Sequence, residues 1–328
     1  MNFPKGSMQA QREVFGNTLL ELVNTDPRVV VLDGDLANST RSEIVAKARP
    51  DKFLMMGIAE QNMAGVAAGL ATVGLIPWCV SFACFLTNRD LDQVRVVVAQ
   101  PKLNVKLAAG YSGILTGKTG KTHQDVSDLS VMRAIPYMTV IAPADAVEVY
   151  QAMYAANAHK GPVYLRLTRD PSPVLFDESY RFQIGKAVVM RQGDDVSLIS
   201  TGVQTWRALE AAELLARERI SASVLHVPTL KPLDTDAIVA AARHTGYVVT
   251  AEDHTILGGL GAAVAETLGE HLPTPMRRVG MRDVFGESAP NDELLEKYGL
   301  TPRHLAEAAR ELLKTRKGKQ TRSGKGAR

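Results

Sequence analysis

The spacing of apolar residues along the chain alternates between two patterns. Apolar positions in residues 12–23 recur at helical intervals, and the run "RVVVLDGDL" that follows is typical of a buried strand that ends in a loop. The same order recurs in "AEQNMAGVAAGLATVG", "IPWCVSF", "LDQVRVVVAQ" and "LNVKLAA". This alternation predicts an α/β fold in which a mostly parallel sheet carries helices on both faces.

Prolines and charges interrupt the pattern in "GPVYLRLTRDPSPVLFD", and a second alternation begins at "AVVMRQGDDVSLIST". The chain has 328 residues, which is more than one hydrophobic core usually holds. We therefore expect a first domain over residues 1–178 and a smaller α/β domain over residues 179–315. Residues 316–328 are expected to form a basic, disordered tail.

The formal net charge of +3 comes from the C-terminal end of the chain. Residues 314–328 hold seven basic residues and no acidic one, whereas the rest has 31 basic and 35 acidic residues. No aromatic residues lie between these basic residues, so the composition disfavours a nucleic-acid-binding arm. We assign this tail no function.

The remaining composition indicates a cytoplasmic protein. Cys79 and Cys84 have no metal-ligand spacing and lie in an apolar stretch, so buried, reduced thiols are expected. The N-terminus lacks the apolar core of a signal peptide. The longest uncharged run, 64–80, is rich in glycine and alanine and contains Pro77, which favours a buried helix and strand over a membrane span.

Ligands of parallel sheets usually bind beyond the carboxyl ends of the strands. Four loops in such positions stand out: "DGDLANST", "SFACF", "AGYSGILTGKTGKTHQD" and "RLTRDP". The glycines of the third loop do not have phosphate-loop spacing, because Gly113 and Gly117 are four positions apart and Gly117 and Gly120 three.

Several residues in or near these loops have two interpretations each. Glu60 follows the apolar "KFLMM", where a carboxyl group is disfavoured as a free anion. His123 lies in a polar loop and could exchange protons with a substrate or simply brace the loop. Phe82 and Phe85 could pack in the core or stack on a flat ligand.

Taken together, these motifs resemble the transketolase family. "MGIAEQNMAGVAAGLA", "SFACF", "GKTHQDVSDLSVMRAIPYMTVIAPADAVEV" and "LRLTRDP" are similar to its pyrimidine-binding domain. "FGESAPNDELLEKYGLTPRHL" is similar to the end of its C-terminal domain. The resemblance runs from about residue 11 to residue 314 and follows the family order.

The resemblance implies thiamine diphosphate as the cofactor and a role for each residue of the site. Glu60 would contact the ring nitrogen of the aminopyrimidine and share a proton with it, and so activate the thiazolium carbon. Phe82 and Phe85 would face the pyrimidine, Asp35 would lie beside the cofactor, and His123 would contact the substrate. The positions that bind the substrate phosphate in the family correspond to Arg12, Ser39, Tyr111 and Arg169.

The sequence departs from the family pattern at three of these positions. Asn88 stands where a third aromatic residue is common, and Tyr111 replaces a phosphate-binding histidine. Thr119 replaces an aspartate that reads the stereochemistry of a sugar hydroxyl. Loss of that carboxylate should change the discrimination among sugars, so a branched or otherwise unusual ketose phosphate is expected as substrate.

We find no counterpart of the family's N-terminal domain, which binds the diphosphate through a metal ion. The resemblance therefore implies the C-terminal subunit of a split transketolase, which transfers a two-carbon ketol unit between sugar phosphates. It would be active only with a separately encoded N-terminal subunit, and the assembly would contain two copies of each subunit. The partner would bind Mg²⁺ or a similar divalent ion. No metal site is expected in this chain.

Three alternatives remain. The beta subunit of the decarboxylating component of a 2-oxo acid dehydrogenase has the same architecture, and deoxyxylulose phosphate synthase is also similar. A non-catalytic binding or regulatory homologue is the third. The sequence does not identify the donor, the acceptor or the partner subunit.

Overall fold

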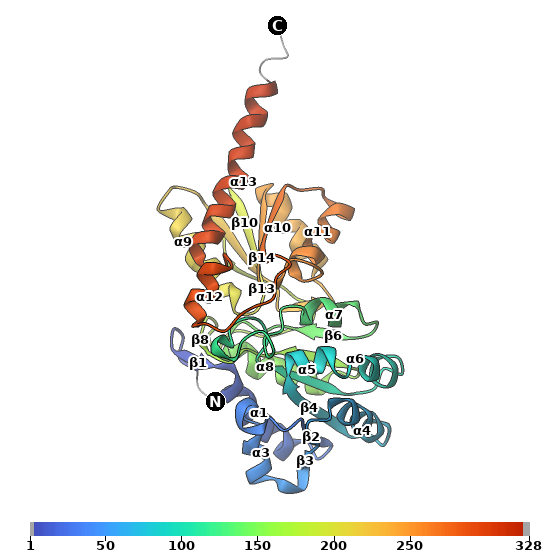
Figure 1. Cartoon of the computed structure of the whole chain (residues 1–328). Helices are drawn as coiled ribbons and strands as arrows, with labels where there is room; N and C mark the ends of the chain where they lie inside the picture. The colour runs from blue at the N-terminus through green and yellow to red at the C-terminus, as the bar shows by residue number, and fades with distance from the viewer. Residues whose placement is uncertain (1–2, 324–328) are drawn as a thin grey trace.

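The computed structural model describes residues 3–323, and for residues 316–323 it gives only the course of the backbone. Two α/β domains are stacked on each other, with the first half of the chain in the lower body of Figure 1 and the second half in the upper one. The predicted fold class is confirmed, because each domain is built on a mostly parallel sheet with helices packed on it.

The first domain contains a seven-stranded sheet with the order β12-β6-β7-β5-β4-β2-β3. Six of these strands pair in parallel. They are β2 (Val29–Asp33), β3 (Phe53–Met55), β4 (Ile76–Phe82), β5 (Lys106–Gly110), β6 (Thr139–Ile141) and β7 (Val163–Arg166). β2 and β4 are buried along their whole length, as expected of central strands covered on both faces.

Alternate residues of β2 belong to two different cores. Val29 and Val31 pack with helices α1 and α8, whereas Val30 and Leu32 pack with the helix α4 on the opposite face. The helical segments of this domain are α1 (Gln11–Thr25), α2 (Ala37–Thr40), α3 (Glu43–Ala48), α4 (Glu60–Thr72), α5 (Ala83–Asn88), α6 (Leu91–Gln93), α7 (Asp128–Ala134) and α8 (Ala146–Ala158), with 3₁₀ turns at Pro50–Lys52 and Gly117–Thr119 and a π-helical segment at Val94–Ala99.

The seventh strand of this sheet comes from the second half of the chain. β12 (Thr229–Lys231) pairs antiparallel with β6 and forms the edge of the sheet. The sequence did not predict this strand, because three residues are too few to show a periodic pattern. As a result, the two domains share a sheet as well as a packed interface.

The second domain contains a five-stranded sheet with the order β14-β13-β10-β11-β9, in which only β9 pairs antiparallel. Its strands are β9 (Val188–Arg191), β10 (Val196–Ser200), β11 (Ala222–His226), β13 (Val248–Thr255) and β14 (Met276–Met281). The helices are α9 (Gln204–Ala216), α10 (Thr235–Thr245), α11 (Leu260–His271), α12 (Asn291–Lys297) and α13 (Pro302–Ser323).

A short ribbon ties the start of the chain to the end of the first domain. β1 (Met8–Ala10) pairs antiparallel with β8 (Pro171–Pro173). Between β8 and β9 the chain crosses from one domain to the other through residues 174–187, and the expected division at 178/179 lies in this connection. We retain that division as a proposal.

Helix α13 reaches into the segment predicted to be a disordered tail. The helix continues to Ser323 and projects from the upper body in Figure 1. Adding turns to a helix that is already packed avoids the cost of a new nucleus, which accounts for this difference from the prediction. Residues 324–328 of the predicted tail lie outside the described residues.

Candidate active site

The residues singled out from the sequence lie beyond the carboxyl ends of β2, β4, β5 and β7. Phe82 ends β4 and Phe85 lies on α5 directly after it, while Tyr111 follows β5 and Arg169 follows β7. Arg12 lies on the first turn of α1. Parallel strands bring their carboxyl ends to one edge, so segments far apart in the sequence meet there.

Glu60 is the first residue of α4 and is fully buried. Its Oε1 accepts a hydrogen bond of 2.9 Å from the Ser81 hydroxyl, and its Oε2 accepts one of 2.6 Å from Arg89 Nη1. Gly34 lies so close that a Cβ built on it would be 3.2 Å from Oε1. Polar and charged groups therefore surround the carboxylate.

These surroundings correct the apolar setting expected for Glu60. Leu54, Met55 and Ile58 are exposed in the isolated chain, at 43%, 52% and 72% of their surface. β3 is an edge strand, so one side of "KFLMM" has no neighbouring strand. The apolar residues form an open face beside Glu60 rather than a wall around it.

Arg89 is a site residue that the sequence interpretation missed. Its guanidinium pairs with Glu60 and also lies over the Phe85 ring, 4.2 Å from the ring centroid. Residues four apart in a helical stretch lie on the same side, so the spacing of Phe85 and Arg89 was the available signal. Arg89 thus links the acid to the aromatic pair.

The aromatic residues form one continuous cluster. Phe82 and Phe85 lie nearly parallel with centroids 6.0 Å apart, and Tyr111 stacks on Phe82 at 4.0 Å. The His123 ring meets Phe82 and Phe85 edge-on, at 5.9 and 5.6 Å. Its Nδ1 is 2.9 Å from the Thr122 hydroxyl, so His123 is held both by the rings and by its own loop.

Tyr111 connects this cluster to two arginines. Its hydroxyl accepts a hydrogen bond of 3.1 Å from Arg12 Nη1, and the Arg169 guanidinium lies 5.5 Å from its ring centroid. The backbone φ of Tyr111 is +57°, a conformation that residues with a Cβ adopt only at a cost. Among the described residues, the Nε atoms of Arg12 and Arg169 are buried without hydrogen-bond partners.

Ser39 and Asp35 are less closely integrated. The Ser39 carbonyl accepts a hydrogen bond of 3.3 Å from Arg12, but its hydroxyl donates to Asn38. Asp35 is exposed and has a φ of +68°. The structured acid of this loop is Asp33, which accepts hydrogen bonds from the Leu36 amide and the Ser42 hydroxyl. Burial raises the pKa of Asp33.

The positions that depart from the family pattern are also at this edge. Thr119 lies in the loop of His123, and its hydroxyl donates to the Thr116 hydroxyl at 2.6 Å. Asn88 is exposed and donates at 3.3 Å to the buried Asp125, which also accepts from Thr87.

No helix within the described residues is both long and apolar enough to cross a membrane. No group of three or more histidine, cysteine, aspartate or glutamate side chains among those residues could hold a metal ion.

Comparison with known proteins identifies the family. Residues 7–173 match the transketolase pyrimidine-binding domain, and residues 185–305 match the transketolase C-terminal domain. The chain belongs to the transketolase family. The members reported below are similar to this chain along nearly their whole length, so the predicted identity as a C-terminal transketolase subunit is confirmed.

Among the transketolase relatives is the 6-deoxy-6-sulfo-D-fructose transketolase subunit SqwH of Clostridium sp. (strain MSTE9). It is 44% identical over 301 residues, which cover 92% of this chain and 94% of the relative. A putative transketolase C-terminal section of Methanocaldococcus jannaschii is 41% identical, with 94% and 98% covered. A solved structure of a split-gene transketolase, an inactive beta4 tetramer, superposes with a TM-score of 0.87 at 47% identity, covering 93% of this chain and 98% of that one.

Proposed function

We propose that this chain is the C-terminal subunit of a split transketolase that transfers a two-carbon ketol unit from a ketose phosphate to an aldose phosphate. The observation that carries the proposal is the convergence of Glu60, the aromatic cluster and two arginines at one edge of the sheet. A carboxylate, a stacking surface and paired cations at one edge suit a flat cofactor and an anionic substrate.

The side chains present fit the pyrimidine end of thiamine diphosphate. Arg89 stacks on Phe85 and donates to Glu60 at the same time. Phe85 offers a ring face and Glu60 offers acceptor oxygens, so together they can hold a planar group with N–H donors at its edge. A protonated aminopyrimidine has this shape and these donors. A bound pyrimidine would take over the contacts that Arg89 makes here.

When bound, thiamine diphosphate supplies the nucleophilic carbon that accepts the ketol unit. Glu60 would hold the proton at the pyrimidine nitrogen, with Ser81 fixing its second oxygen. Phe82 and Phe85 would exclude water from one face of the ring. His123 lies against both rings, in place to exchange a proton with a substrate hydroxyl or carbonyl.

Arg12, Tyr111 and Arg169 would bind the charged end of the substrate. The two buried Nε groups without partners are donors that an incoming phosphate or sulfonate could satisfy. Asp35, in the exposed loop at this edge, would lie beside the cofactor. We propose an unusual ketose as donor, supported by Tyr111 and Thr119 and by the sulfosugar named for the SqwH relative.

A separately encoded N-terminal subunit would complete the site and bind the diphosphate through Mg²⁺ or a similar ion. The exposed apolar side chains Leu54, Met55 and Ile58, directly before Glu60, support an association at this edge. We propose two copies of each subunit and a cytoplasmic location.

The test is to mix this chain with its candidate N-terminal subunit, thiamine diphosphate and Mg²⁺, and to assay ketol transfer from a panel of ketose phosphates and sulfosugars. Activity should need both subunits and should be low with xylulose 5-phosphate and ribose 5-phosphate. Ketol transfer by this chain alone would contradict the split-subunit proposal. Oxidative decarboxylation of a 2-oxo acid by the pair would favour the dehydrogenase alternative, and failure to bind the cofactor would favour a non-catalytic homologue.

A further inference from the structure

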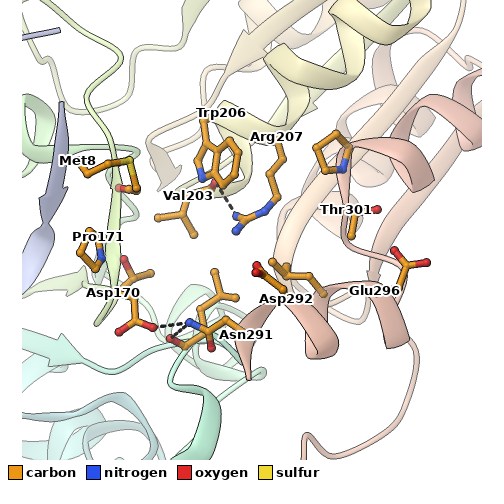
Figure 2. A pocket seen from close by; sticks show the side chains of 15 residues that line it. Met8, Asp170, Pro171, Val203, Trp206, Arg207, Asn291, Asp292, Glu296 and Thr301 are labelled. Atoms are coloured by element: carbon orange, nitrogen blue, oxygen red, sulfur yellow. Dashed lines mark hydrogen bonds between the residues drawn. The ribbon is translucent and has the colours of Figure 1, made fainter. Parts of the chain in front are cut away.

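A cavity of about 520 Å³ lies between the two domains, apart from the residues assigned to catalysis. Figure 2 shows side chains from the β1 and β8 region on one side, and from α9 and α12 on the other. Thr168 and Asp170 line the cavity, whereas Arg169 between them lies over Tyr111 of the active site. The segment after β7 therefore separates two sites.

The cavity wall contains buried polar atoms that lack hydrogen-bond partners among the described residues. They are Thr168 Oγ1, Ser172 Oγ and Asn291 Oδ1. Thr168 and Ser172 are only 6% and 5% exposed. A buried polar atom without a partner is disfavoured, and two hydroxyls and one amide oxygen of this kind around one cavity indicate that something polar belongs in it.

Arg207 contributes hydrogen-bond donors to the same cavity wall. Its side chain extends from α9 into the cavity in Figure 2, and the residue is 6% exposed. The hydrogen bond it makes is from Nη1 to the carbonyl of Val203, one turn earlier in its own chain. Burial lowers the pKa of Arg207 to about 10, which leaves it charged at neutral pH. A guanidinium has five N–H groups, so it can donate further bonds.

The charges around the cavity nearly cancel. The Asp170 carboxylate accepts from Asn291 and lies 3.6 Å from Arg169, and Glu296 pairs with Arg303. Asp292 is the third acidic residue of the cavity wall, and it faces the same space as Arg207 in Figure 2. A phosphate would meet carboxylates on one side of this cavity, whereas an uncharged molecule with both donors and acceptors could satisfy both sides.

We infer that this cavity binds an uncharged, polyhydroxylated small molecule, such as a free sugar or a polyol. Its hydroxyls would donate to Asp292 and the Asn291 oxygen, and would accept from Arg207, Thr168 and Ser172. The apolar side chains of Met8, Leu115 and Leu295 offer surfaces for its C–H groups, and the Trp206 ring lies next to them with Arg207 stacked on it, 4.2 Å from the ring centroid. The volume suits a ligand of this size.

Binding can be followed by tryptophan fluorescence, because the two tryptophans have different surroundings. Trp206 lines the cavity, whereas Trp78 is fully buried in β4. Titration of the full chain with D-ribose, D-xylose, D-fructose or glycerol should give a saturable change with at least one probe. If the sugar is D-ribose, D-ribose 5-phosphate should displace it from the cavity only at concentrations at least about tenfold higher, and the phosphate esters of the other sugars should behave in the same way.

Two variants locate the binding. Ser172→Ala, which removes one hydroxyl and little volume, should weaken binding about tenfold, while Ser179→Ala, at an exposed serine, should leave it unchanged. Arg207→Gln should weaken it at least as much, with folding checked by circular dichroism.

The inference would be overturned by the absence of saturable binding, by displacement of the bound sugar by its phosphate ester at equal or lower concentration, or by equal effects of the two serine variants. It would also fail if the N-terminal subunit abolishes binding on assembly, because the cavity would then be a subunit contact. None of these outcomes depends on ketol-transfer activity, so the inference and the proposed function can fail separately.

Discussion

Glu60 is held by one neutral and one charged donor, Ser81 and Arg89, on its two oxygens. The sequence drew attention to this acid through its apolar neighbours, and the structure gives a different reason for its burial. Its position at the start of α4 places its carboxylate close to Gly34 and beside Ser81 near the end of β4. Burial by backbone and polar partners cannot be seen in a one-dimensional pattern.

Glu60→Gln should leave the fold and subunit assembly intact and reduce the turnover of the reconstituted enzyme at least about a hundredfold, because an amide cannot hold the proton in the same way. Turnover of the assembled pair and its mass by light scattering are the measurements. Glu43→Gln, at a surface ion pair with Lys47, is the matched control and should be active. Normal turnover in Glu60→Gln would make Glu60 a structural acid.

Tyr111→Phe keeps the ring on Phe82 but removes the acceptor for Arg12. We expect KM for the anionic donor to rise about tenfold with a smaller change in kcat, since a hydrogen bond to a charged group is lost from substrate binding. Tyr137→Phe, at an exposed tyrosine, is the control. A kcat decrease with unchanged KM would contradict an anchoring role.

At the scale of elements, fully buried strands were the most predictable part of the fold. The stretch "IPWCVSF" coincides with β4, all seven residues of which are buried. The stretch "LDQVRVVVAQ" is helical as predicted, and within it Val94–Ala99 is π-helical. That change of pitch depends on how the segment packs, which periodicity alone does not specify.

The turn between α5 and α6 contains Asp90, a fully buried acid whose two oxygens lack hydrogen-bond partners among the described residues. Burial raises the pKa of Asp90 to about 8. Between about pH 4 and 8 the folded chain therefore keeps a proton that the unfolded chain releases, so the free energy of unfolding falls as pH rises through this range.

Asp90→Asn should flatten this pH dependence and make the chain more stable than the parent at pH 8–9, because no carboxyl group is forced to ionise. Urea unfolding at pH 5, 7 and 9 measures it. Asp92→Asn, two residues further along and exposed, should show the parental slope. If the free energy of unfolding of the Asp90 variant had the parental pH dependence, Asp90 would not be its source.

At the scale of the whole molecule, a buried arginine of the first domain also donates to the second domain. Arg166 at the end of β7 donates to Asp128 at 2.8 Å and to the Asp253 carbonyl at 2.7 Å, and Tyr164 donates to the same Asp128 oxygen. Arg166 and Asp128 are almost inaccessible to solvent. Both domains therefore contribute to satisfying one buried cation.

Asp128→Asn should destabilise the chain by about 3–5 kcal/mol, because the guanidinium of Arg166 loses its buried counter-charge. Urea unfolding monitored by circular dichroism gives this value. Asp51→Asn, at the exposed pair with Arg49, serves as control and should change little. A small effect in the Asp128 variant would mean that the buried Arg166 does not depend on this carboxylate.

Because the ribosome makes the chain from its N-terminus, β12 becomes available to pair with β6 only late in synthesis. Every other strand of the seven-stranded sheet has been synthesised by Arg166, but the edge at β6 stays open until Thr229–Lys231 has emerged. An open edge can pair with other chains. Translation that stops soon after residue 178 would therefore release a fragment prone to aggregate rather than a finished domain.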